Sequence, residues 1–118
     1  MSYDIYLKDE NGNTYETEPF FEGGIQLVRG CSETYLNITY NYSWYYYKYL
    51  DEKEGIRYLY GKRAEDCIGR LYNAINEFPD IAAYERDYWC PCPGNCSHAL
   101  SILLSWCYKF PNGIFEGD

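Results

Sequence analysis

The 118-residue chain has the length of a single domain, and its formal net charge is −8, from 18 acidic and 10 basic residues. Hydrophobic residues make up 47% of it, which excludes a disordered tail and is enough to build a core without metal or disulfide staples. The negative charge disfavours direct binding of nucleic acid, because affinity for phosphates depends on basic surfaces.

The N-terminal region predicts a β-hairpin. Apolar and polar residues alternate over 3–8, which indicates a half-buried strand with Asp4, Tyr6 and Lys8 on its polar side. A turn is expected at the following Asn-Gly pair, and residues 14–18 are expected to return as the second strand. A further short strand is predicted over 25–28.

Alternation is sharpest over residues 36–43, where one side is apolar and the other carries amide and hydroxyl groups. That polar side is either solvated, as is usual for antiparallel sheets, or the lining of a pocket. The aromatic stretch 44–50 predicts a short helix capped by Ser43, with a continuing strand as the alternative.

Two stronger helices are predicted towards the C-terminus. Apolar residues recur at helical spacing from Ala64 to Phe78, and Pro79 ends that helix. A second helix is expected from about residue 96 to residue 110, with Asn95 as its N-cap. The chain is therefore predicted to be one α+β domain over 1–118, an antiparallel sheet with an N-terminal hairpin and two main C-terminal helices packed on one face.

The segment Gly55–Arg63 is similar to a phosphate-binding loop but does not satisfy its pattern. Five residues separate the two glycines where four are needed, and Arg63 stands where a Ser or Thr would bind magnesium. Hydrolysis of nucleoside triphosphates is thus rejected. The basic residues Arg57, Lys62 and Arg63 form either a local anion site or a solvated surface.

A cluster of thiols and one imidazole precedes and begins the last helix. Its members are Cys90, Cys92, Cys96 and His98, which are the ligand types of a zinc site. Their spacing is not that of a zinc finger or ribbon, and it also lacks the Cys-x-x-Cys arrangement of redox proteins. A proline-fixed loop that leads into a capped helix is the alternative. No acid–base pair or nucleophile is recognised, so the chain is expected not to be an enzyme.

Location is inferred from what the sequence lacks. No stretch approaches the roughly 20 apolar residues of a membrane span, and the N-terminus has neither the basic nor the apolar region of a signal peptide. We therefore expect a cytoplasmic protein with reduced thiols and no membrane contact.

Several strings together resemble an uncharacterised family of small phage and bacterial proteins. They are Met1–Ile5, Leu36–Tyr42, Gly55–Arg57, Tyr60–Lys62, Asp87–Trp89, Gly94-Asn95 and Gly117-Asp118. The string Leu36–Tyr42, Leu-Asn-Ile-Thr-Tyr-Asn-Tyr, is the most specific of them. The family pattern has Pro, Thr and Glu before Gly94-Asn95, where this chain has cysteines. The resemblance implies a phage or prophage setting and hence the cytoplasm of a bacterial host.

Phage proteins of this size often act against host defence, which gives three hypotheses. The first is a non-catalytic protein that sequesters a small, polar, nucleotide-like ligand; its candidate binding residues are Asn37, Thr39, Asn41, Trp44, Tyr46, Arg57, Tyr60 and Lys62. The second is an acidic, tyrosine-rich inhibitor, similar to an anti-CRISPR protein, that occupies a basic surface of a host effector. The third is an interaction module stabilised by zinc.

Overall fold

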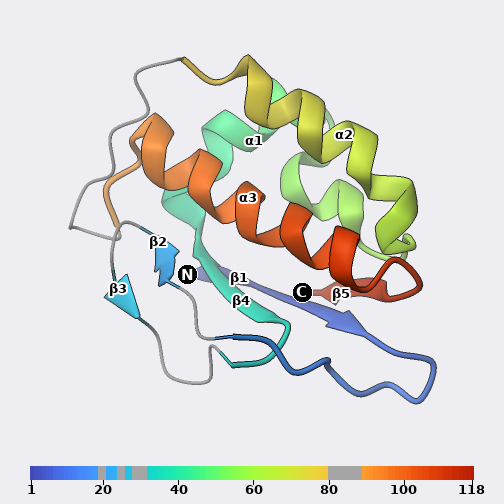
Figure 1. The fold of residues 1–118 in the computed structure, drawn as a ribbon. Coiled ribbons are helices and arrows are strands. Elements are labelled where there is room, and N and C mark those ends of the chain that lie inside the picture. Colours follow the sequence, from blue (N-terminus) through green and yellow to red (C-terminus); the bar gives the residue numbers. More distant parts are fainter. Residues whose placement is uncertain (19–20, 24–25, 28–31, 80–88) are drawn as a thin grey trace.

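The computed structural model has an α+β fold, as predicted, built on a three-stranded antiparallel sheet. It describes residues 1–18, 21–23, 26–27, 32–79 and 89–118. The strands are β1 (Ser2–Lys8), β4 (Tyr35–Thr39) and β5 (Ile114–Gly117), in the order β4-β1-β5. The two ends of the chain therefore lie next to each other in the sheet (Figure 1).

Strand β1 is the central strand, and its alternation separates the two faces of the sheet. Ile5 lies opposite Leu36 of β4, and Leu7 lies opposite Phe115 of β5; all four side chains are fully buried. The intervening residues of β1 are only partly buried. The predicted strand over 3–8 is thus confirmed, with a period of two that assigns its apolar residues to the core.

Three helices cover the apolar face of the sheet: α1 (Ser43–Tyr49), α2 (Ala64–Glu77) and α3 (Pro93–Lys109) (Figure 1). The predictions of a short helix over 44–50 and of two longer C-terminal helices are confirmed, but Ser43 is the first residue of α1 and not its N-cap, which is Tyr42. Helix α3 packs on α2, and its buried residues lie around most of its circumference. None of the helices in the described ranges is long and apolar enough to cross a membrane.

The start of α3 differs from the prediction that Asn95 caps it. Cys92 is the N-cap, and Pro93 occupies the first helical position. A proline is well accommodated there, because its missing N–H would have no partner in the helix and its φ angle already suits the helix. Asn95 is instead fully buried in the first turn.

The returning strand of the predicted N-terminal hairpin is the part of the sheet that differs from the prediction. Residues 14–18 do not form a strand; they make only isolated bridges, Lys8 with Thr14 and Glu16 with Glu33. Both edges of β1 are already paired, with β4 and β5, so no edge remains for a returning strand along its length. The Asn-Gly turn does form, with Gly12 at φ 80°, a conformation that glycine adopts at no steric cost.

Two short strands, β2 (Phe21–Gly23) and β3 (Gln26–Leu27), pair with each other in a separate sheet. The strand predicted over 25–28 coincides with β3 at residues 26 and 27, and its other two positions lie outside the described residues.

The strand predicted over 36–43 ends earlier, at Thr39. The Thr39 side chain accepts a hydrogen bond from the backbone N–H of Asn41 at 3.2 Å and so caps the 3₁₀ helix η1 (Tyr40–Tyr42). This turn carries Tyr42 into the core, where it is fully buried. Burial of a whole tyrosine ring favours the helical turn over continued alternation.

The buried side chain of Thr34, the residue before β4, links its own segment to two others by hydrogen bonds. Replacing it tests how much these bonds stabilise the fold. The Thr34 hydroxyl donates to the Leu7 carbonyl at 2.6 Å and accepts from the Tyr15 N–H at 3.0 Å. We expect Thr34→Val to lower the free energy of unfolding by about 1–3 kcal/mol, since it leaves buried backbone groups unpaired. Urea denaturation monitored by circular dichroism measures the loss.

Thr17 provides the matched control for this substitution. Its hydroxyl is also buried but has no hydrogen-bond partner among the described residues. Thr17→Val removes a polar atom that contributes no hydrogen bond, so the expected effect is zero or a small gain in stability. Equal losses for the two variants would show that the hydrogen bonds of Thr34 do not stabilise the fold.

Candidate functional site

The face of the sheet opposite the helices carries a group of polar and aromatic side chains, which we call the open sheet face. Its members are Asp4, Tyr6 and Lys8 of β1, Tyr35 and Asn37 of β4, and Glu116 of β5. The register brings them together, because Asp4 lies opposite Asn37, and Tyr6 lies between Tyr35 and Glu116. No helix of the described residues covers this face (Figure 1).

The Asp4 carboxylate is fixed by its neighbours on β4. The same oxygen accepts a hydrogen bond from the Tyr35 hydroxyl at 2.7 Å and from the Asn37 amide at 2.9 Å. Partial burial acts to raise the pKa of Asp4, but these hydrogen bonds outweigh it and hold the pKa below the usual value. Asp4 is therefore a preorganised anion at neutral pH.

Aromatic rings and a second carboxylate lie beside it. The Tyr6 and Tyr35 rings stack with centroids 4.9 Å apart. The Lys8 ammonium lies 5.0 Å from the centroid of the Tyr6 ring and 2.8 Å from the Glu116 carboxylate. A shallow depression adjoins these groups, lined by Asp4, Tyr6, Lys8, Glu116, Gly117 and Asp118. Lys8 is thus bound by an aromatic ring and a carboxylate, the same kinds of group with which proteins recognise the cationic groups of ligands.

The predicted ligand residues of the segment 37–46 lie in different places. Asn37 belongs to the open sheet face, whereas Thr39 is buried and caps η1. Asn41 and Trp44 are exposed, and the Asn41 amide donates to the Trp89 carbonyl at 2.9 Å. Tyr46 does not lie on the surface, as a ligand-binding residue would, because α1 turns its side chain into the core. Its hydroxyl donates to a backbone carbonyl there, and no ligand could reach it without opening the core.

The three basic residues expected to form an anion site do not share a common set of partners; each contacts different groups of the chain. Arg57 donates to the Tyr40 hydroxyl and to the Asp118 carbonyl, both at 3.1 Å, and its guanidinium lies 4.8 Å from the centroid of the Tyr3 ring. Lys62 donates to the Tyr58 carbonyl. In a third place, Arg63 contacts Asn112 and Glu65.

Tyr60, the remaining predicted ligand residue, packs its ring against Gly117 at the end of β5. Its hydroxyl is buried and has no hydrogen-bond partner among the described residues. Burial raises the pKa of this hydroxyl, and the nearby Asp118 carboxylate adds to the rise. The tight fit of ring on glycine makes Tyr60 a packing residue of the β5 end.

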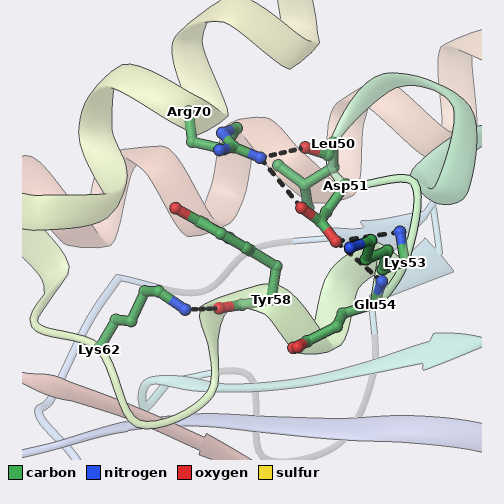
Figure 2. A network of polar contacts seen from close by, with 7 residues as sticks. All are labelled: Leu50, Asp51, Lys53, Glu54, Tyr58, Lys62 and Arg70. Atoms are coloured by element: carbon green, nitrogen blue, oxygen red, sulfur yellow. Dashed lines mark hydrogen bonds and ion pairs between the residues drawn. The ribbon is translucent and has the colours of Figure 1, made fainter.

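Figure 2 shows a second place where cations and an aromatic ring meet, with Tyr58 beside Arg70 of α2 and Lys62. Tyr58 lies between Arg70 and Lys62, whose charged groups are 4.2 and 3.9 Å from its ring centroid. Arg70 also donates to the Asp51 carboxylate at 3.2 Å. Backbone N–H groups, that of Glu54 above all, hold the pKa of Asp51 below its usual value.

Pairing of cations with aromatic rings extends through the described residues. Among the eight basic side chains that the structure describes, five lie over tyrosine or tryptophan rings: Lys8, Lys48, Arg57, Lys62 and Arg70. Only three ion pairs with carboxylates occur in the same part of the chain. Most of the acidic side chains there are consequently not neutralised by contact with a cation.

The cysteine cluster is arranged around the start of α3. Cys96 is fully buried, and Cys90 and Cys92 are half-buried. Burial raises the pKa of Cys96, with a further contribution from the two neighbouring thiols. Across the described residues, no three His, Cys, Asp or Glu side chains converge on a common position for a metal ion.

Sequence reasoning did not select the open sheet face as a site. The alternation of residues 3–8 identified its β1 members as the polar side of a strand. Glu116 carried no comparable signal, because β5 has only four residues. Comparison with family models, curated proteins and solved structures found no match.

Proposed function

We propose that this chain is a non-catalytic binding protein that recognises a basic surface of another protein through its open sheet face. The observation that carries the proposal is the register of the sheet. It places two carboxylates, Asp4 and Glu116, beside the stacked rings of Tyr6 and Tyr35 on a face that no described helix covers.

The chemistry of this face suits a guanidinium group. An arginine side chain forms parallel hydrogen bonds with a carboxylate and stacks its flat surface on an aromatic ring. Both kinds of partner are present within the reach of one side chain. Lys8 occupies part of this space, but an exposed ion pair such as Lys8–Glu116 contributes little energy and can exchange for an incoming cation.

Charge distribution supports the same partner. The net charge is −8, and among the described residues Lys48, Arg57 and Lys62 lie over rings without forming an ion pair with a carboxylate side chain. A field of one sign attracts a protein of the opposite charge and accelerates its association. Taken with the resemblance to small phage proteins, this favours a basic effector of host defence as the partner.

The alternative, sequestration of a nucleotide-like ligand, receives less support from the geometry. Its eight candidate residues do not line one cavity: Thr39 and Tyr46 are buried, and the cationic groups of Arg57 and Lys62 already contact rings of the chain. A stabilising zinc ion would have to draw together thiols that the structure places partly in the core and partly at its edge.

A titration with three probes distinguishes these possibilities. Amide chemical shifts of isotope-labelled protein are recorded with a short arginine-rich peptide, a glutamate-rich peptide of equal length, and adenosine monophosphate. We expect the arginine peptide alone to shift residues of β1 and β5, and added salt to weaken the effect. Shifts with the nucleotide near Arg57 and Lys62, without any with the arginine peptide, would contradict the proposal and favour sequestration.

A further inference from the structure

The segment Cys90-Pro91-Cys92 forms a tight turn. The Cys92 N–H donates to the Cys90 carbonyl at 2.8 Å, the hydrogen bond that closes a three-residue turn. Such a turn suits Pro91, because proline fixes φ near the value of its central residue. Residues two apart are separated by at most about 7 Å between Cα atoms. The turn shortens that distance into the range of roughly 4.4–6.8 Å that a disulfide bridges.

The two thiols differ in their surroundings, which assigns them different roles. Cys92 is the N-cap of the 17-residue helix α3, and its sulfur accepts a hydrogen bond from the Asn95 N–H at 3.4 Å. Helix N-termini stabilise negative charge, because the first N–H groups of a helix have no acceptor within the helix itself. Cys90 is held beside it, since the Asn95 amide donates to the Cys90 carbonyl at 3.3 Å. Both thiols are only half-buried.

We propose that Cys90 and Cys92 form a thiol–disulfide exchange site for low-molecular-weight disulfides such as oxidised glutathione. The Cys92 thiolate attacks one sulfur of the disulfide, a mixed disulfide forms, and one thiolate leaves. Cys90, deprotonated in turn, attacks the Cys92 sulfur and displaces the second thiolate. The net products are a Cys90–Cys92 disulfide and two small thiols, which carry the two protons lost by the protein.

The other described cysteines provide an internal contrast. Burial raises the pKa of Cys67 to about 11 and that of Cys107 to about 12, so both remain protonated at neutral pH. Because the thiolate is the nucleophile, these two side chains are poor at attacking a disulfide. Cys96 is fully buried and cannot meet a dissolved disulfide while the core stays closed. The expected reaction is therefore confined to Cys90 and Cys92 within the described residues.

The test is oxidation of the reduced, full-length protein by oxidised glutathione at neutral pH. Samples are quenched with acid over time and analysed by mass spectrometry with fragmentation to locate each modification. We expect the segment with Cys90 and Cys92 to lose the mass of two hydrogen atoms, at least about tenfold faster than any change at Cys67 or Cys107.

Two serine variants test the order of attack. Cys90→Ser is expected to accumulate a stable glutathione adduct on Cys92, because the resolving thiol is absent. Cys92→Ser keeps an oxygen at the helix N-cap, so the fold is retained and the adduct on Cys90 forms more slowly. A disulfide of Cys92 with another cysteine, or modification of Cys92 no faster than that of Cys67, would overturn the proposal.

Discussion

Replacing Phe115 with alanine is expected to lower the free energy of unfolding by about 3–5 kcal/mol, the usual loss when a buried phenylalanine is truncated in a core. Phe115 is fully buried and is the central apolar residue of β5, opposite Leu7. Its backbone is bonded on the other side to the turn before α2, with the Phe115 N–H donating to the Lys62 carbonyl at 3.0 Å and the Gly61 N–H donating back at 2.8 Å.

This loss is large for a protein of this size, whose total stability is of the order of 5–15 kcal/mol. Urea denaturation measures it, and Tyr108→Ala on α3 is the matched control, because that aromatic side chain is 60% exposed. The control is expected to change stability by no more than about 0.5 kcal/mol. If both variants unfolded at the same urea concentration, β5 would not be an integral strand of the sheet.

β5 also shows where local sequence patterns cease to be informative. The α2 and α3 helices were predicted correctly, because a helical stripe is a repeated signal within 14 to 17 residues of chain. Strand β5 has four residues and only one buried side chain, so its alternation is too short to recognise. Its stability comes from β1, more than 100 residues earlier in the chain.

Competition between pairing partners explains why no strand follows the N-terminal turn over residues 14–18. A turn at Asn11-Gly12 is a local preference and forms as predicted, but a returning strand needs a free edge of β1. Two distant segments occupy those edges, β4 and β5, and each buries apolar residues in register with β1. The local sequence at Asn11-Gly12 therefore determines the turn, but it does not determine whether a strand follows it.

The candidate site was predictable only in part, for the same reason. Alternation over 3–8 identifies Asp4, Tyr6 and Lys8 as one polar row. It cannot reveal that Tyr35 stacks on Tyr6 or that Glu116 reaches Lys8, because these contacts depend on strand register. Likewise, the alternation over 36–43 could not disclose that the chain turns into helix after Thr39 and so divides the expected polar row between separate surfaces.

Reversing the charge of Glu116 with Glu116→Lys is expected to weaken binding of an arginine-rich peptide by on the order of 10- to 100-fold, because like charges brought together at an interface cost several kcal/mol. The substitution places a second ammonium beside Lys8 in the depression that Asp4 and Tyr6 line. Chemical-shift titration of each variant with the peptide at low salt gives the dissociation constants.

Glu65→Lys is a close match for this variant at a different place. It changes the net charge by the same amount and removes an exposed ion pair of similar geometry, since Glu65 contacts Arg63 at 3.0 Å and Glu116 contacts Lys8 at 2.8 Å. The two glutamates are 45% and 54% exposed, respectively. Glu65 lies in the first turn of α2, away from the open sheet face.

Long-range attraction responds to net charge and would weaken equally in the two variants, whereas a contact on the open sheet face would be lost only with Glu116→Lys. We therefore expect Glu65→Lys to weaken binding less than about threefold and to lose even that difference in added salt. Equal weakening in both variants would mean that the acidic field alone attracts the peptide and that the open sheet face does not bind it.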